Sequence, residues 1–281
     1  MIQREAHAKI NLTLAVTGKR KDGYHTLATV MQEISLADTL RAEKAQEGVS
    51  LVCSDPALPT DEGNLCVKAA RAYLAAAGEP GGVKLTLEKK IPSGAGLGGG
   101  SSDAAATLLL LSELYPADAD LFSLAVSLGA DVPFFLAGGT CLCTGIGEVL
   151  RPLYFPGKEQ LWCVVAKESE GLSTPEVYRA YDELENKPEH DPAQNIVEAM
   201  TWGDPEAVYP FLSNDLERAA YVLRPEIREL RTYLKALGAE ATQMTGSGSA
   251  VFGLFRDKNS AAWAAANVKK RGALTFLCTL L

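Results

Sequence analysis

Hydrophobic and polar residues alternate strictly near the start of the chain. In residues 9–16 isoleucine, leucine and valine take the even positions, whereas Lys9, Asn11 and Thr13 share the opposite side. A period of two predicts a β-strand with one polar face. Asp22-Gly23 then supplies turn chemistry, and an apolar stretch that runs to Leu36 follows. The opening therefore predicts a β-hairpin.

Further segments have the periodicity of helices or of strands. Asn64 is suited to cap a helix that stops at Gly78, and Pro225 to open one that stops at Gly238. Residues 185–195, rich in charge, Pro and Asn, predict a loop. The other expected elements are strands at 49–54, 83–89, 161–166 and 274–281, and helices at 103–115 and from Asn259 or Ser260 onward.

The mixture of these elements predicts the fold class. Helices and strands follow one another without a regular βαβ repeat, which favours α+β over a doubly wound sheet. A chain of 281 residues is long enough for about two domains. Pro152, Pro156 and Gly157 interrupt the pattern just past the middle of the chain, so we expect domains at 1–152 and 153–281.

Composition and charge exclude several classes of protein. With 47% hydrophobic and 22% charged residues, the chain has the composition of a folded globular protein. Its 27 basic and 35 acidic side chains give a net charge of −8, which argues against a nucleic-acid partner. The sequence has no signal-peptide pattern and no apolar run of about 18 residues, so we expect no membrane segment. We expect a cytoplasmic protein without a membrane partner; the oligomeric state stays open.

Cysteine and histidine give little sign of a metal site. The six cysteines lie in apolar surroundings without ligand spacing, and a reducing cytosol would keep them as thiols. The chain has three histidines, so a His-rich metal centre is not expected. No metal ligand can be assigned from the sequence.

The strongest chemical signal is a glycine-rich run between an expected strand and an expected helix. Glycines leave backbone N–H groups uncovered, a helix N-terminus adds partial positive charge, and serine adds hydroxyl donors. This combination predicts a phosphate-binding loop, whereas a flexible linker would not run directly into an Ala- and Leu-rich helix. The run is Pro92-Ser93-Gly94-Ala95-Gly96-Leu97-Gly98-Gly99-Gly100-Ser101-Ser102.

The common phosphate-loop classes do not fit this run. Gly94, Gly96 and Gly99 match the dinucleotide pattern, but Pro116 and more helix follow in place of the required second strand. Gly100 stands where a Walker loop needs lysine, and the protein-kinase motifs are missing. Another class of nucleotide-binding loop is needed.

The sequence resembles the GHMP small-molecule kinases nearly end to end. Besides the glycine run, the resemblance is carried by Ala8-Lys9-Ile10-Asn11-Leu12, Asp22-Gly23-Tyr24-His25, Asn64-Leu65, Gly129-Ala130-Asp131-Val132-Pro133-Phe134-Phe135, Asn214-Asp215 and Thr245-Gly246-Ser247-Gly248-Ser249. The glycine run alone marks the superfamily. Lys9 with Asn11, Gly23-Tyr24-His25 and the run that begins at Gly129 are specific for its branch that phosphorylates a cytidine-diphosphate-linked methylerythritol.

The resemblance implies a two-domain GHMP kinase fold with the active site in the interdomain cleft. It implies transfer of the ATP γ-phosphoryl group to a tertiary 2-hydroxyl, a step of non-mevalonate isoprenoid synthesis. Asp131 would be the base and Lys9 the cation that keeps Asp131 ionised. The same resemblance implies that Asn11, Tyr24, His25, Thr174 and Tyr178 bind the cytidine substrate, and that Asn64, Leu65 and residues 92–102 bind ATP; Mg²⁺ is inferred from the chemistry.

Several of these residues have plainer explanations. Asp131 is also suited to cap a short helix, and Asn64 is equally well explained as a helix cap. Lys9 alone on a polar strand face is usually exposed to solvent. Tyr24 and His25 are also consistent with ordinary hairpin packing.

Three residues depart from the family pattern: His7, Thr13 and Asp103. Asp103 adds an anion at a phosphate-binding helix start, where it would repel ATP unless Mg²⁺ bridges them. Two alternative functions remain at this stage. One is a different GHMP kinase that acts on homoserine, mevalonate or a sugar, and the other is a non-catalytic nucleotide-binding regulator.

Overall fold

The computed structural model describes residues 1–168, 170–185, 187 and 192–281. Contacts divide the chain into two compact units, and the long strands β1 (Ile2–Lys19) and β2 (His25–Ala45) contribute to both. The first unit consists of Met1–Ala8, Ala37–Pro92 and Gly98–Gly138, and the second of Lys9–Leu36, Ser93–Leu97 and Gly139–Leu281. Mixed sheets and helices confirm the α+β class, whereas the domain boundary at 152–153 stays a prediction.

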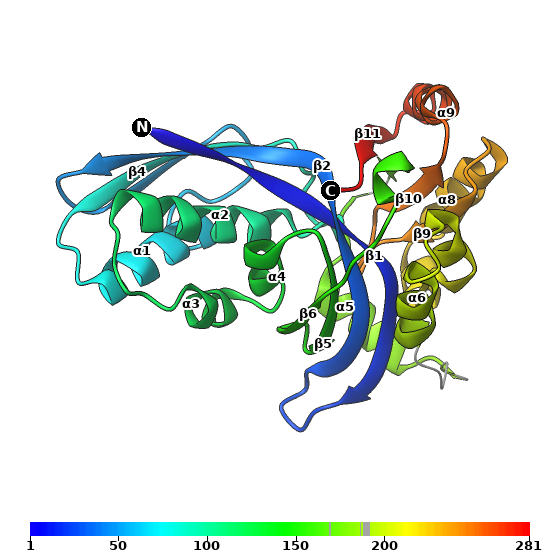
Figure 1. Ribbon diagram of the computed structural model, residues 1–281, viewed down its shortest axis with the longest axis horizontal. Coiled ribbons are helices and arrows are strands. Elements are labelled where there is room, and N and C mark those ends of the chain that lie inside the picture. Colours follow the sequence, from blue (N-terminus) through cyan, green and yellow to red (C-terminus); the bar gives the residue numbers. More distant parts are fainter. Residues whose placement is uncertain (169, 186, 188–191) are drawn as a thin grey trace. The chain divides into compact units, whose positions relative to one another are not determined.

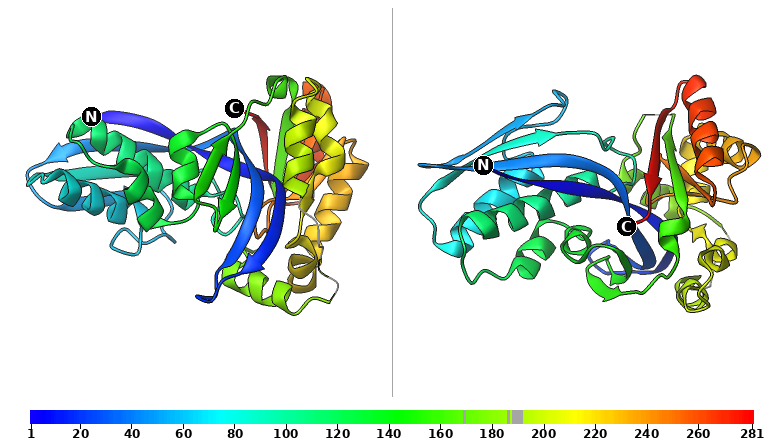
Figure 2. Two further views of the ribbon diagram at one scale, coloured as in Figure 1. Left: turned by 60° about the horizontal axis from the view of Figure 1, so that its bottom comes forward. Right: turned by 45° about the horizontal axis from the view of Figure 1, so that its top comes forward.

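The first unit places helices against one face of a sheet (Figures 1 and 2). Strand β4 (Gly82–Glu88) pairs antiparallel with the end of β2 and parallel with β3 (Val49–Cys53). The helices are α1 (Leu65–Ala77), α2 (Gly99–Leu114), α3 (Leu121–Leu128) and α4 (Val132–Ala137).

The helix ends of α1 follow their local sequence. The Asn64 side chain accepts a hydrogen bond from the N–H of Cys66, and Gly78 ends the helix with a left-handed φ of 62°. A side-chain cap and a left-handed C-terminal glycine satisfy backbone groups that the helix leaves open. The predicted start and stop of this helix are confirmed.

Helix α2 begins at Gly99, four residues before the predicted start at Asp103. Gly98 has a left-handed φ of 72° and forms the N-cap, so Gly99 and Gly100 already belong to the helix. The prediction was wrong because glycine has low helix propensity, which tertiary context overrides here. The glycine run therefore supplies the first turn of α2.

The second unit contains a four-stranded antiparallel sheet in the order β11-β7-β10-β9. Its apolar core joins this sheet to helices, with Val164, Val177, Leu230 and Ala264 fully buried. The elements are β7 (Trp162–Lys167), β9 (Ala241–Met244), β10 (Val251–Phe255), β11 (Leu274–Thr279), η1 (Lys158–Gln160), α5 (Thr174–Asp182), α6 (Pro192–Met200), η2 (Pro205–Phe211), α7 (Glu217–Leu223), α8 (Glu226–Ala236) and α9 (Lys258–Lys270).

The β1–β2 hairpin extends this unit with shorter strands. Strand β2 pairs antiparallel with β5 (Thr140–Gly145), which pairs with β6 (Val149–Pro152). Strand β1 pairs parallel with the two-residue strand β8 (Ser213–Asn214). The predicted hairpin is confirmed, and both of its strands are longer than expected.

The structure corrects three further expectations. The polar face of β1 is buried, with Lys9 only 3% exposed. Helix α9 begins at Lys258 with Asp257 as its cap, because the Asp257 carboxylate reaches the N–H of Ser260. Of the predicted loop at 185–195, residues 186 and 188–191 lie outside the described residues, and 192–195 form the start of α6.

Two further properties concern helix length and the cysteines. Across the described ranges, we find no helix with the length and apolar character needed to span a bilayer. All six cysteines are free thiols, and five of them are buried.

Candidate functional site

The second unit contains a buried ammonium, that of Lys9. Lys9 Nζ donates to Asn11 Oδ1 at 2.7 Å and to the carbonyl oxygen of Gly96 at 2.9 Å. The N–H of Lys9 also bonds the carbonyl oxygen of Leu97, at 3.0 Å, so strand β1 and the glycine run are joined directly. A buried charge is retained where hydrogen bonds compensate its lost hydration. The structure therefore excludes the solvent-exposed alternative for Lys9.

Both the oxygen and the nitrogen of the Asn11 side-chain amide form hydrogen bonds. Its Oδ1 accepts from Lys9, and its Nδ2 donates to Thr29 Oγ1 at 2.8 Å. Its backbone N–H donates to Thr245 Oγ1, 234 positions further along the chain. With 1% of its surface exposed, Asn11 is placed to orient Lys9.

The glycine run packs against the turn that follows β9. A Cβ at Gly96 would lie 2.2 Å from the carbonyl oxygen of Thr245, and φ of Gly96 is +73°. The opposing Gly246 would place a Cβ 2.9 Å from the carbonyl oxygen of Gly96 and 3.2 Å from Lys9 Nζ. Both glycines are required here by close approach of two main chains. Asn214 steadies the turn by donating to the carbonyl oxygens of Met244 and Gly246.

The amide groups of the run are left open for a ligand. Its carbonyl groups accept bonds from Lys9, Leu172 and Ala250. Within the described part of the chain, by contrast, the N–H groups of residues 93–101 donate to no other group. Uncovered N–H groups that lead into a helix N-terminus form a favourable environment for phosphate.

Next to the first turns of α2, the first unit contains a buried cluster of one lysine and two aspartates. Lys89 Nζ bonds Asp103 Oδ2 at 2.7 Å and also contacts Asp38 Oδ2. Asp38 in turn accepts the N–H of Ile91 at 2.9 Å, just before the glycine run. Burial acts to lower the pKa of Lys89, but the two carboxylates outweigh it and raise the pKa.

The Asp103 carboxyl is buried and bonded to Lys89. It is 3% exposed, and its Oδ1 has no hydrogen-bond partner within the described residues. Burial, with Asp38 adding to it, raises the pKa of Asp103 to about 7 against the opposing effect of Lys89. Lys89 offsets part of the negative charge that Asp38 and Asp103 bring to the start of α2.

The remaining predicted residues of the first unit lie at helix starts. Asn64 caps α1 and also donates to the carbonyl oxygen of Pro59 at 2.8 Å, so the capping alternative is realised. A Cβ at Gly100 would lie 3.7 Å from Leu65 Cδ1, which places the starts of α1 and α2 side by side. Asp131 occupies the N-cap position of α4, but its side chain makes no capping hydrogen bond.

Aromatic side chains meet where the hairpin faces α5. The rings of His25 and Tyr178 stack with centroids 4.7 Å apart and planes 19° from parallel. His25 Nε2 lies 2.8 Å from Asp182 Oδ1. Tyr24 is 62% exposed, so its ring is not packed into the hairpin. Thr174, at the start of the same helix, shares a 2.9 Å hydrogen bond with Ser247.

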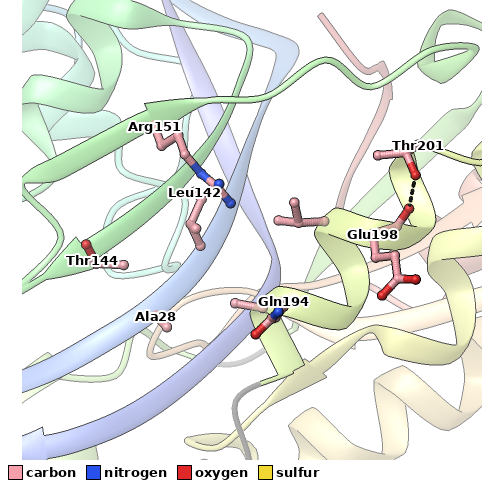
Figure 3. Close-up of a pocket in the computed structure, with 9 residues that line it drawn as sticks. Ala28, Leu142, Thr144, Arg151, Gln194, Glu198 and Thr201 are labelled. Atoms are coloured by element: carbon pink, nitrogen blue, oxygen red, sulfur yellow. Dashed lines mark hydrogen bonds between the residues drawn. The ribbon is translucent and has the colours of Figure 1, made fainter.

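A separate pocket of about 580 Å³ in the second unit contains none of the predicted site residues. Figure 3 shows Leu142 and Arg151 of the β5–β6 pair on one side and Gln194, Glu198 and Thr201 of α6 on the other. This pocket is not part of the Lys9 cluster.

Two residues of these clusters have no local sequence signal. Thr29 holds Asn11, and Asp182 holds His25, from other parts of the chain. Only the folded chain brings them to their partners.

Comparison with known proteins identifies the family. The model "GHMP kinases N terminal domain" matches residues 64–139, and "GHMP kinases C terminal" matches residues 193–274. A 4-diphosphocytidyl-2-C-methyl-D-erythritol kinase from Thermus thermophilus is 45% identical over 271 residues, which cover 96% of this chain and 94% of the relative.

Solved structures agree with this assignment. A crystal structure of 4-(cytidine 5'-diphospho)-2C-methyl-D-erythritol kinase is 44% identical, covers 99% of both chains and has a TM-score of 0.85. A homoserine kinase from Cytophaga hutchinsonii, at 19% identity, covers 99% of this chain and 94% of its own, with a TM-score of 0.77, and shares the fold. ATP is a substrate of these kinases, and a small molecule is the other. The chain belongs to the GHMP kinase family, within its group of 4-diphosphocytidyl-2-C-methyl-D-erythritol kinases.

Proposed function

We propose that this chain transfers the γ-phosphoryl group of ATP to the 2-hydroxyl of 4-diphosphocytidyl-2-C-methyl-D-erythritol, a step of non-mevalonate isoprenoid synthesis. Identity of 45% along almost the whole chain supports this substrate. The observation that carries the chemistry is the buried Lys9 ammonium, held by Asn11 and by the carbonyl oxygen of Gly96.

The phosphates of ATP would bind the main chain of the glycine run. Phosphoryl transfer depends mainly on alignment and on neutralising charge, with one group to accept the hydroxyl proton. Open N–H groups between Ser93 and Ser101 supply the donors. The side chains of Ser101 and Ser102 add hydroxyl groups, while Asn64 and Leu65 at the start of α1 would meet adenine or its ribose.

Asp131 would accept the proton of the acceptor hydroxyl, and Lys9 would keep that carboxylate ionised and orient the hydroxyl. The absence of a capping bond from Asp131 to α4 supports a role other than helix capping. Asn11 would act by fixing Lys9. Tyr24, His25, Tyr178 and Thr174 would bind the cytidine portion, since an exposed aromatic ring such as that of Tyr24 stacks readily on a base.

Magnesium would enter with ATP. In kinases this ion keeps water ligands and is held by substrate phosphates with few protein groups. The described residues contain no cluster of three or more His, Cys, Asp or Glu that would form a protein cage, and this fits such a shared site. The ion would neutralise charge on the transferred group.

The reaction would take place in the cytoplasm. Free thiols at all six cysteines support a reducing compartment.

An assay with several acceptors tests the function. The purified chain is incubated with ATP, Mg²⁺ and, in turn, 4-diphosphocytidyl-2-C-methyl-D-erythritol, homoserine, mevalonate or a sugar, and ADP release and product mass are followed. We expect phosphorylation of the cytidine compound alone. Turnover with another acceptor instead would indicate a different GHMP kinase. ATP binding without turnover on any acceptor would indicate a non-catalytic regulator.

A further inference from the structure

Helix α5 fixes the imidazole of His25 from three sides. Tyr178 stacks on the ring, and Tyr181 meets its edge with centroids 6.3 Å apart and planes 86° from parallel. The third contact is the 2.8 Å bond between His25 Nε2 and Asp182 Oδ1. The His25 side chain is only 8% exposed, so the ring has little freedom to turn.

The Asp182 carboxylate is itself held in place. Lys19 Nζ bonds its Oδ2, while Oδ1 receives His25. Lys187 Nζ donates to the backbone carbonyl oxygen of Asp182 at 2.9 Å and lies 4.0 Å from Oδ1. Burial acts to raise the pKa of Asp182, but the bonds from Lys19 and His25 outweigh it and lower the pKa. Asp182 is therefore ionised at neutral pH.

An ionised carboxylate can only accept hydrogen bonds, so the proton must lie on His25 Nε2. In a neutral imidazole the other nitrogen, Nδ1, is then a bare acceptor. Nδ1 has no hydrogen-bond partner within the described residues. It is the ring nitrogen that remains for a ligand.

A bare acceptor distinguishes two kinds of pyrimidine. Cytosine has an exocyclic amine where uracil has a carbonyl oxygen. The amine donates to Nδ1, whereas the carbonyl would place two acceptors against each other. Sites that hydrogen-bond one substrate group reject analogues that lack it, because a buried polar group is left unpaired.

We propose that Asp182 is a positioning residue that holds His25 in the Nε2–H tautomer, so that Nδ1 selects an amino pyrimidine over an oxo pyrimidine in the nucleotide substrate. This inference rests on the proposed function, since it requires a pyrimidine nucleotide at His25. Asp182 acts through His25 and need not touch the substrate.

The first test determines the tautomer of His25 directly and does not depend on catalytic activity. Nitrogen NMR of the histidine-labelled protein, at about pH 8 and assigned with a His25→Gln variant, distinguishes protonated from bare ring nitrogens. We expect a protonated Nε2 and a bare Nδ1 in the wild-type protein, and a mixture of tautomers in Asp182→Ala. A protonated Nδ1 in the wild type would overturn the proposal whether or not any variant folds.

The second test measures selectivity. The ratio of kcat/KM for the cytidine substrate to that for its uridine analogue should fall about tenfold or more in Asp182→Ala, mainly through KM. Glu183→Ala removes an exposed carboxylate directly after the end of α5 and should keep the wild-type ratio. An unchanged ratio in Asp182→Ala would refute the role of Asp182. If the wild type phosphorylates neither nucleotide, the proposed function fails, and the selectivity proposal fails with it.

Discussion

The ammonium of Lys9 lies 2.7 Å from Oδ1 of Asn11, two positions further along the same strand, and both side chains are buried. Residues two apart on a strand point to the same face, so one strand places a cation and the group that orients it. The bond from Asn11 to Thr29 in the neighbouring strand prevents the amide from turning away.

Replacing Asn11 by alanine should lower turnover about tenfold or more, because Lys9 loses a fixed acceptor. Steady-state kinetics with ATP and the cytidine substrate measure this effect. Asn267→Ala, which removes an amide from the outer part of α9, serves as a control. Wild-type turnover in Asn11→Ala would show that Lys9 needs no such support.

Asp131 and Asp120 form a matched pair, because both precede a helix. Asp120 accepts the N–H groups of Phe122 and Ser123, whereas Asp131 makes no capping bond. Asp120→Ala should destabilise the fold by about 1 kcal/mol and leave turnover unchanged. Asp131→Ala should lower turnover at least about a hundredfold while ATP still binds. Thermal melts, titration with ATP and kinetics separate these effects, and near-normal turnover in Asp131→Ala would exclude it as the base.

Gly100 tests the phosphate loop more directly than the other glycines. A Cβ at this position meets only Leu65, at an ordinary 3.7 Å, so the fold does not require glycine there. Alanine should leave stability unchanged or raise it by up to about 1 kcal/mol, since it favours helix. We expect weaker ATP binding if phosphate approaches this main chain. Gly96→Ala, which would clash with Thr245, should destabilise the protein, and unchanged ATP affinity in Gly100→Ala would argue against the cradle.

The raised pKa of Asp103 predicts how stability changes with pH. An ordinary aspartate has a pKa of 3.8, and in the folded protein that of Asp103 rises to about 7. Between these values the folded protein keeps a proton that the unfolded chain has released. The free energy of unfolding should therefore fall as pH rises from about 4 to about 7, by at most about 4 kcal/mol, and level off above.

Asp103→Asn should remove this part of the pH dependence, because its amide oxygen can still accept from Lys89 and carries no charge. Urea unfolding at pH 5 and pH 8 measures it. The same fall in stability in both proteins would mean that other groups cause it.

Tyr24 provides a test of base recognition. Its ring is 62% exposed, so alanine should change stability by no more than about 0.5 kcal/mol. Loss of a stacking surface should raise KM for the cytidine substrate about tenfold and leave KM for ATP unchanged. Equal changes in both KM values would argue against this role.

Local patterns predicted the elements well where one residue decides a boundary. Asn64 and Gly78 set the ends of α1, and the alternation in residues 9–16 gave the strand. Patterns failed where tertiary contacts decide. The buried polar face of β1 depends on Thr245, and the start of α2 at Gly99 overrides glycine's low propensity.

The candidate site followed the same rule. Lys9, His25 and the glycine run were identified through motifs, whereas Thr29 and Asp182 needed coordinates because their partners are distant in sequence. The Lys89 cluster also had no signal, since a buried charge is visible only once its partners are placed.

The bond between the N–H of Asn11 and Thr245 joins positions 234 residues apart. During synthesis, a nascent chain exposes Lys9 and the glycine run long before Thr245 leaves the ribosome. Contacts of such large separation form late, because the intervening chain must first be ordered. The contact that ties the Asn11 main chain to the turn after β9 therefore forms only when translation is nearly complete.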